Sequence, residues 1–153
     1  MTLQTTIRRT LARTPGPPTL LIVSDSHVGS TLAAEFESTA SVTLVTDHHG
    51  VAGQAPDGVR VISGEVTDRE TLGEAGDALA AVVALRADRR AVLATQLLRN
   101  ALDIRDVVVL VNDPQRHEVF DNIGVATVCV SSHLSTELRQ ALETSLSTFE
   151  PAH

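Results

Sequence analysis

The stretch Leu20-Leu21-Ile22-Val23-Ser24-Asp25-Ser26-His27-Val28-Gly29 decides the fold. Four consecutive apolar residues bounded by turn residues are typical of a strand that is buried on both faces. The polar turn that follows leads directly into residues 28–38, whose composition is helical. A buried strand that passes through a tight turn into a helix is the opening unit of many α/β domains. The stretch therefore predicts an α/β fold built on a parallel sheet.

The same alternation of apolar runs and helical segments continues to the end of the chain. Asp68 and Asp88 are expected to cap the second and third helices, whereas the connection at 47–58 contains no convincing helix. The pattern predicts a Rossmann-like doubly wound parallel sheet of six strands in the order 3-2-1-4-5-6, in a three-layer α/β/α arrangement. The expected strands are 20–23, 41–46, 59–62, 80–85, 107–111 and 125–130, and the expected helices are 28–38, 68–75, 88–102, 113–122 and 132–149.

The length of 153 residues predicts one domain. Residues 1–18 are expected to form an amphipathic N-terminal helix, with Leu3, Ile7 and Leu11 at four-residue spacing, and a Pro-rich linker. Residues 19–149 are expected to form the Rossmann-like domain, and 150–153 a short tail.

The composition excludes several classes of function. A net charge of −7 and the absence of Trp and Tyr argue against a nucleic-acid binder. The longest apolar run, residues 78–85, is far too short to span a bilayer. The single cysteine, Cys129, excludes an internal disulfide and a multi-cysteine zinc site, and is expected in the core. The polar N-terminus has no signal-peptide pattern, so a cytoplasmic location is expected. All twelve basic residues are Arg, which with the acid excess suits a halophile.

The candidate site lies where the first two strands end. Ligands of doubly wound sheets bind beyond the carboxyl ends of the strands, beside strand one. Asp47 ends the second strand 23 residues after Ser24, the spacing of a ribose-binding acid. Of the G-x-G-x-x-G pattern only Gly29 remains. Ser24 and Ser26 replace the first two glycines and add side chains where a phosphate needs space, and the acid between them adds negative charge.

Later segments carry a family resemblance. The chain contains Gly64-Glu65-Val66-Thr67-Asp68 with Leu72 and residues 74–76, then residues 81–84 with Asp88, then residues 111–114 with Phe120 and residues 124–125. In this order, over about residues 19–142, the chain resembles the N-terminal nucleotide-binding domain of Trk-type potassium-uptake regulators. That domain is also called the RCK, KTN or TrkA-N domain.

The resemblance implies a Rossmann fold that binds NAD or an adenine nucleotide. It also implies a homodimer that controls a membrane-bound potassium transporter or channel. By family position, Val66 and Thr67 would border the adenine, and His27 stands where relatives often carry Arg. An acid at position 47 favours NAD or ATP, ADP or AMP over NADP.

Arg86 either faces a phosphate or ribose or is a solvated loop residue, while Arg89 and Arg90 are expected on a solvated helix face. The predicted cofactor-binding residues are Ser24, Asp25, Ser26, His27, Val28, Gly29, Asp47, His48, Glu65, Val66, Thr67 and Arg86.

Two other interpretations of the same residues remain open. Residues 21–27 resemble the strand-D-x-H opening of calcineurin-like metallophosphoesterases, and Asp47-His48-His49 matches the triplet of DHH phosphoesterases. Both families need further metal-binding motifs that this sequence lacks. A metal held by Asp25, His27, Asp47 and His48 is the minority hypothesis. The two remaining histidines outside this region and the C-terminus, His117 and His133, are expected on the surface.

The sequence therefore predicts a non-catalytic, regulatory nucleotide-sensing module of potassium-transport type, since no nucleophile and base are placed as acyl or phosphoryl transfer requires. One alternative is an interaction or dimerisation module with a vestigial pocket, and another is a phosphoesterase or dehydrogenase. Leucines at fours along residues 134–146 predict a homodimer through the last helix. In a monomer that helix would cap its own sheet.

Overall fold

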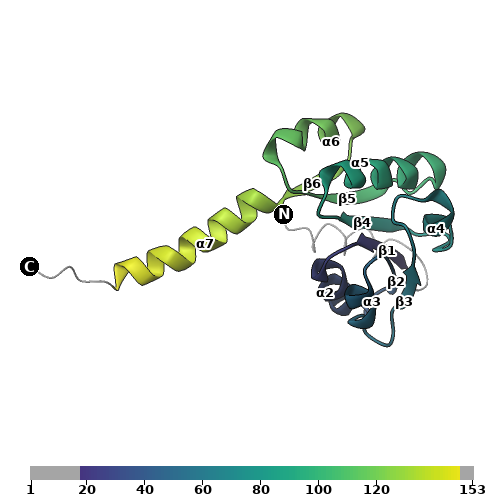
Figure 1. Ribbon diagram of the computed structural model, residues 1–153, viewed down its shortest axis with the longest axis horizontal. Helices are drawn as coiled ribbons and strands as arrows, with labels where there is room; N and C mark the ends of the chain where they lie inside the picture. Colours follow the sequence, from purple (N-terminus) through teal and green to yellow (C-terminus); the bar gives the residue numbers. More distant parts are fainter. Residues whose placement is uncertain (1–17, 149–153) are drawn as a thin grey trace, which may run out of the picture.

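The computed structural model describes residues 18–148. The expected N-terminal helix, nearly all of the Pro-rich linker and the C-terminal tail lie outside these residues. Six parallel strands form one sheet in the order β3-β2-β1-β4-β5-β6, which confirms the predicted topology (Figure 1). The strands are β1 (Thr19–Ser24), β2 (Ser41–Thr46), β3 (Arg60–Ser63), β4 (Ala80–Ala84), β5 (Asp106–Val111) and β6 (Ala126–Cys129).

Helices cover both faces of the sheet, as the buried apolar strands require. Alternate residues of β1 point to opposite faces, so Leu20 and Ile22 pack towards α2 and α3, whereas Leu21 and Val23 pack towards α4, α5 and α6. The core is aliphatic apart from Phe36 and Phe120. The helices are α2 (His27–Phe36), α3 (His49–Gly53), α4 (Arg69–Gly73), α5 (Asp88–Gln96), α6 (His117–Ile123) and α7 (Val130–Ser147), with a π-helical turn at Leu97–Ala101 and a 3-10 turn at Pro114–Arg116.

The connection between β2 and β3 departs from the prediction, because it contains the short helix α3. Val51 is fully buried in the core and anchors this helix. The remaining residues of α3 are small or polar, so the five-residue segment has too little apolar periodicity to be recognised in the sequence.

Asp88 corrects a second expectation, since Ala87 is the N-cap of α5 and Asp88 its first residue. The buried Asp88 carboxylate instead holds the loop after β5. It accepts hydrogen bonds from the backbone N–H groups of Asn112 (2.8 Å) and Asp113 (2.8 Å), and from the Asn112 side-chain amide (3.1 Å). Asp68, by contrast, is the N-cap residue of α4 as predicted.

Cys129 also differs from the sequence prediction. Cys129 is only half-buried, at the end of β6 rather than in the core, because α7 begins at the next residue and leaves the body of the protein. A hydrogen bond from Ser132 lowers the pKa of its thiol. His117 is half-buried and joins α6 to β6, through hydrogen bonds with Asp121 (3.0 Å) and Thr127 (2.8 Å).

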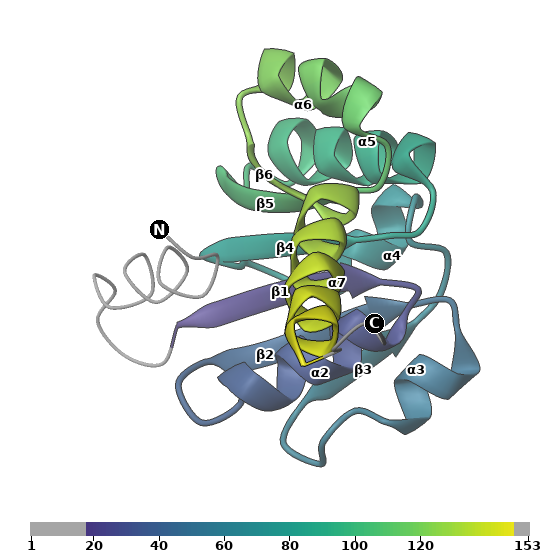
Figure 2. The same cartoon turned by 90° about the vertical axis from the view of Figure 1, so that its left-hand side faces the viewer.

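Helix α7 stands apart from the sheet. Figure 1 shows it extending away from the body, and Figure 2 looks along it. None of its residues is buried in the part of the chain that the structure describes. Leu134, Leu138, Leu142 and Leu146 are between 55% and 68% exposed. The helix therefore does not cap its own sheet. Among residues 18–148, no helix is long and apolar enough to cross a membrane.

Candidate functional site at the strand ends

The turn after β1 is held together from inside by Ser24. Its hydroxyl donates to the carbonyl of Ala84 (2.9 Å) and accepts from the backbone N–H of Ser26 (3.2 Å). Ser24 is fully buried, so it offers no hydroxyl to a ligand, contrary to the sequence expectation. A Cβ on Gly29 would lie 2.4 Å from the Ser24 Cβ. Gly29 is thus required for close packing of α2 against β1, the role of the third glycine in this type of turn.

Asp25 is almost buried, with 9% of the residue exposed. One carboxylate oxygen accepts from the backbone N–H of Arg86 (3.0 Å), and the other accepts from Arg90 Nη1 (3.2 Å). The negative charge that the sequence places beside the turn is therefore paired within the chain. This pairing ties the turn after β1 to the loop after β4.

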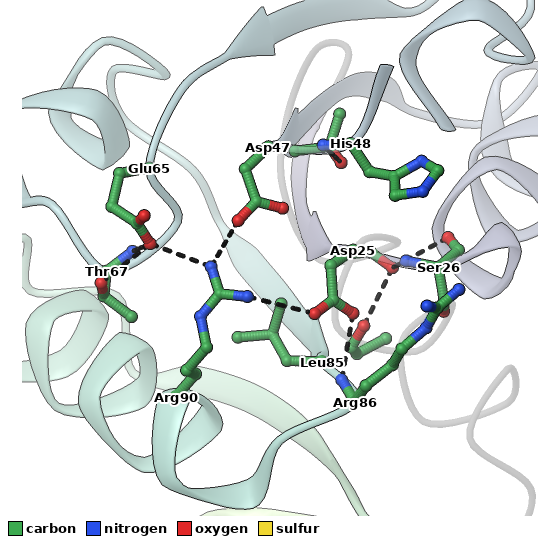
Figure 3. Close-up of polar contacts among 12 residues, drawn as sticks. Asp25, Ser26, Asp47, His48, Glu65, Thr67, Leu85, Arg86 and Arg90 are labelled. Carbon is green, nitrogen blue, oxygen red and sulfur yellow. Dashed lines mark hydrogen bonds and ion pairs between the residues drawn. The ribbon is translucent and has the colours of Figure 1, made fainter. Parts of the chain in front are cut away.

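Arg90 lies at the centre of the candidate site (Figure 3). Its Nη1 contacts Asp25, while its Nη2 donates to Asp47 (2.5 Å) and to Glu65 (2.9 Å). The three acids follow β1, β2 and β3, and Arg90 lies in α5, which follows β4. Because these four strands are neighbours in the sheet, one guanidinium connects the carboxyl ends of all four. We call Arg90, Asp25, Asp47 and Glu65 the strand-end cluster.

Pairing within the cluster changes two pKa values. The hydrogen bond from Arg90, helped by those from Thr67, lowers the pKa of Glu65. Burial alone would lower the pKa of Arg90, but its hydrogen bonds with Asp47 and Glu65 outweigh burial and raise it. Arg90 is therefore a permanent cation at physiological pH.

The prediction that Arg90 lies on a solvated face of α5 is wrong. The guanidinium is drawn inward because three carboxylates converge within its reach. The signal for this was available in the sequence. Arg90 lies in the first turn of the helix after β4, and parallel strands bring that turn to the same edge as the acids after β1, β2 and β3.

The other predicted site residues differ in their exposure and in their distance from the cluster. Ser26 is half-buried at the N-cap of α2 and, with the exposed Arg86, lies beside the cluster (Figure 3). Thr67 donates its hydroxyl to Glu65 (3.0 Å). Val66 is fully buried in the core and presents no surface to an adenine ring. His27, Val28 and His48 are exposed at the starts of α2 and α3.

Thr67 also borders an open hollow of about 580 Å³ between α4 and α5. Its walls combine apolar side chains with the side-chain amides of Gln96 and Asn100. The sequence analysis did not predict this hollow, since most of its residues come from the far end of α5 and the π-helical turn. The lining residues are Thr67, Arg69, Leu93, Gln96, Leu97, Asn100 and Ala101.

The metal hypothesis finds no support in the geometry of residues 18–148, where no three His, Cys, Asp or Glu side chains are grouped to hold an ion. Asp25 and Asp47, two of the four residues considered, are instead both paired with Arg90.

This arrangement, a parallel sheet with an acid at the end of β2 facing the turn after β1, agrees with a comparison of sequences. Residues 20–131 match the TrkA-N domain. The chain belongs to the TrkA-N family. Its likeness to the Trk system potassium uptake protein TrkA of Streptomyces coelicolor is 28% identity over 114 residues. These residues are 71% of this chain and 51% of that protein, so the chain spans about half the length of this relative.

Solved structures share the fold of this TrkA-N domain at lower identity. The NAD(P)-binding domain of an exopolyphosphatase-related protein from Archaeoglobus fulgidus aligns with a TM-score of 0.66 and 16% identity, over 82% of this chain and 97% of that one. The GsuK channel bound to NAD aligns with a TM-score of 0.62 and 22% identity, over 82% of this chain and 25% of that one. These likenesses confirm the Rossmann-like fold.

Proposed function

We propose that this TrkA-N domain is a regulatory module that binds NAD or an adenine nucleotide and passes its state of occupancy to a potassium-transport protein. The observation that carries the proposal is the position of Asp47. It directly follows β2, beside the turn after β1, where doubly wound folds bind the ribose of a nucleotide. The family and the relative named for potassium uptake support the transport context.

Asp47 has one carboxylate oxygen available to a ribose hydroxyl. Its Oδ2 is held by Arg90, while Oδ1 has no hydrogen-bond partner among residues 18–148 and faces the site. That oxygen would accept from a ribose hydroxyl in a charge-assisted hydrogen bond, which contributes roughly 1.5–3 kcal/mol. An acid that accepts from the ribose 2′-hydroxyl disfavours a phosphate at that position.

The start of α2 is the proposed phosphate position. This ten-residue helix has no acidic residue in its first turn, so its free N–H groups and its dipole favour an anion. Asp25 lies close by, but Arg90 and the Arg86 N–H already pair its charge. Asp25, Asp47 and Glu65 all contact the one guanidinium of Arg90, so none of them is a free general base. The role is therefore binding without catalysis.

Calorimetry with NAD⁺, NADH, ATP, ADP and AMP at high salt tests the proposal. Asp47→Asn keeps the shape of the side chain and removes its charge, so the affinity of the best ligand should fall about tenfold or more. Asp57→Asn, in an exposed loop, removes the same charge away from the site and should leave the affinity unchanged. If the wild-type chain binds no nucleotide of the panel, or if Asp47→Asn binds as well as wild type, the proposed site is wrong.

A second proposed role is homodimerisation through α7. The specific observation is that its four leucines are exposed on a helix that leaves its own sheet (Figures 1 and 2). Apolar stripes of this kind are buried in helix pairs, and a second copy of the chain offers the same stripe in return. Such a dimer would give a transporter at the cytoplasmic face of the membrane a two-fold docking partner. A monomer mass by light scattering at high salt and tens of micromolar protein would contradict it.

A further inference from the structure

The guanidinium of Arg90 lies between the two parts of the proposed nucleotide site. Its Nη2 faces the ribose acceptor Asp47, and its Nη1 faces Asp25 in the turn where phosphate would bind (Figure 3). These opposite contacts give Arg90 two different effects on an incoming ligand, depending on whether the ligand carries a negative charge.

For an uncharged nucleoside, Arg90 offers no attraction. A ribose hydroxyl that donates to Asp47 approaches a carboxylate already engaged in a charge-assisted hydrogen bond. An uncharged ligand brings no group that attracts the guanidinium away from the three acids. Such a ligand can use Oδ1 of Asp47, which leaves the contact of Arg90 with Oδ2 in place, but it gains nothing from the guanidinium.

For a phosphorylated ligand, Arg90 is an attractive charge. Without it, a phosphate at the start of α2 would face three unpaired carboxylates, those of Asp25, Asp47 and Glu65. The turn from residue 24 to residue 29 contains no Arg, and the chain contains no Lys. The permanent cations beside the site are Arg90 and Arg86, and in this group the guanidinium of Arg90 is the one that contacts the carboxylates.

We propose that Arg90 is the specificity-determining residue of this site, making binding depend on a phosphate group and discriminating against unphosphorylated nucleosides. The inference rests on the proposed nucleotide site and adds to it the residue that selects the ligand class. Phosphate oxygens would take over part of the guanidinium's hydrogen bonding, since Arg pairs with phosphate as it does with carboxylate. An uncharged nucleoside has no group that can do so.

The test compares AMP with adenosine, which differ only in the phosphate. In calorimetry at fixed salt, Arg90→Gln should weaken AMP about tenfold or more, while adenosine binds as well as before or more tightly. The ratio of the two affinities should therefore fall at least tenfold. Arg89→Gln is the matched control, because it removes the same charge from the neighbouring, exposed residue of α5. That variant should keep the wild-type ratio.

Arg90→Lys is a second variant, which retains the charge but not the two-sided guanidinium. Its ratio of AMP affinity to adenosine affinity should lie between those of wild type and Arg90→Gln. This variant also keeps the test available if Arg90→Gln does not fold, which thermal unfolding would show. An AMP-to-adenosine affinity ratio that is unchanged in Arg90→Gln would overturn the inference while leaving the nucleotide site intact. If only Arg90→Lys folds, an unchanged ratio in that variant would do the same. Failure of the wild-type chain to bind any nucleotide would instead refute the proposed function itself.

Discussion

The strand-end cluster and helix α7 are opposites in how they use their side chains. In the cluster, one guanidinium and three carboxylates satisfy one another inside a single chain. On α7, four leucines are more than half exposed, and none of the helix's residues is buried among residues 18–148. Groups that are already paired can exchange partners with a small polar ligand at little net cost. An apolar stripe without a partner gains free energy only by association, and this difference is why we propose ligand binding at the cluster and assembly through α7.

Hydrogen bonds join the two regions through the loop after β5. The hydroxyl of Ser131, in the first turn of α7, donates to the carbonyl of Asn112 (2.7 Å). The backbone N–H of Asn112 donates to Asp88 (2.8 Å), which begins α5, the helix that carries Arg90. The first turn of α7 is therefore connected through hydrogen bonds to α5, the helix that carries Arg90.

The largest effect should come from a charge on the apolar stripe. Leu138 is 68% exposed, so Leu138→Arg should leave the fold of one chain intact and yet prevent the proposed dimer. Burial of one Leu side chain contributes about 1.5–3 kcal/mol, and a symmetric dimer loses it twice. The dimer dissociation constant should therefore rise about a hundredfold or more, as measured by analytical ultracentrifugation.

The matched control is Gln140→Arg, which adds the same charge to a different face of α7. It should leave the dissociation constant within a few-fold of wild type. Equal effects of the two substitutions would show that charge in general, and not the leucine stripe, governs association.

A smaller effect is expected beneath the cluster. In Gly29→Ala, the new Cβ would lie 2.4 Å from the Ser24 Cβ, and neither atom can move without the backbone. Crowding of this kind should lower the free energy of unfolding by about 1–3 kcal/mol in denaturant titrations. Gly53→Ala, at a glycine with no atom within 4 Å of the added Cβ, should not.

Ser24→Gly in the same chain removes the clashing atoms but also the hydrogen bonds of the Ser24 hydroxyl, so the double variant should lose less stability than the sum of the two single variants. Simple addition of the two single effects would mean that Ser24 and Gly29 do not contact each other as described. This pair tests the inward orientation of Ser24, on which the absence of its hydroxyl from the ligand surface depends.

Much of the fold could be predicted because buried parallel strands are continuous apolar runs, such as residues 20–23 and 80–84. The strand order followed from the position of Asp47 and the alternation of elements, and the structure confirms it. The helix α3 escaped prediction because a single buried residue, Val51, holds it. Local periodicity cannot show an anchor that only the assembled sheet provides.

The acids of the site could be placed at the strand ends, and the first turn of α5 at the same edge of the sheet, but which side chain of that turn points inward could not be predicted. Asp25, Asp47 and Glu65 each follow a strand, so the sheet topology brings them together. Arg90 belongs to a helix whose polar residues normally face solvent, and only the three-dimensional distances show that it turns inward. The orientation of Ser24 was hidden for a similar reason, since a turn residue can point either way until its neighbours are fixed.

The smallest predicted effect concerns Glu65, the most exposed acid of the cluster, and the pH dependence of stability. Arg90 lowers the pKa of Glu65 below the ordinary value of 4.5, so the folded protein favours the ionised carboxylate more than the unfolded chain does. The resulting stabilisation is complete above pH 4.5 and is lost as the pH falls through the lower pKa of the folded state. For a carboxylate this exposed, the contribution is below about 1 kcal/mol. Wild type should therefore exceed Glu65→Gln slightly in unfolding free energy near pH 6, and the difference should shrink as the pH is lowered below 4.5.

Glu35→Gln, which removes an exposed carboxylate without an ion pair among residues 18–148, should show no such convergence with wild type. A difference between wild type and Glu65→Gln that stays constant down to pH 3 would mean that Glu65 is held by packing and not by its charge, and that the cluster depends on Asp25 and Asp47 alone.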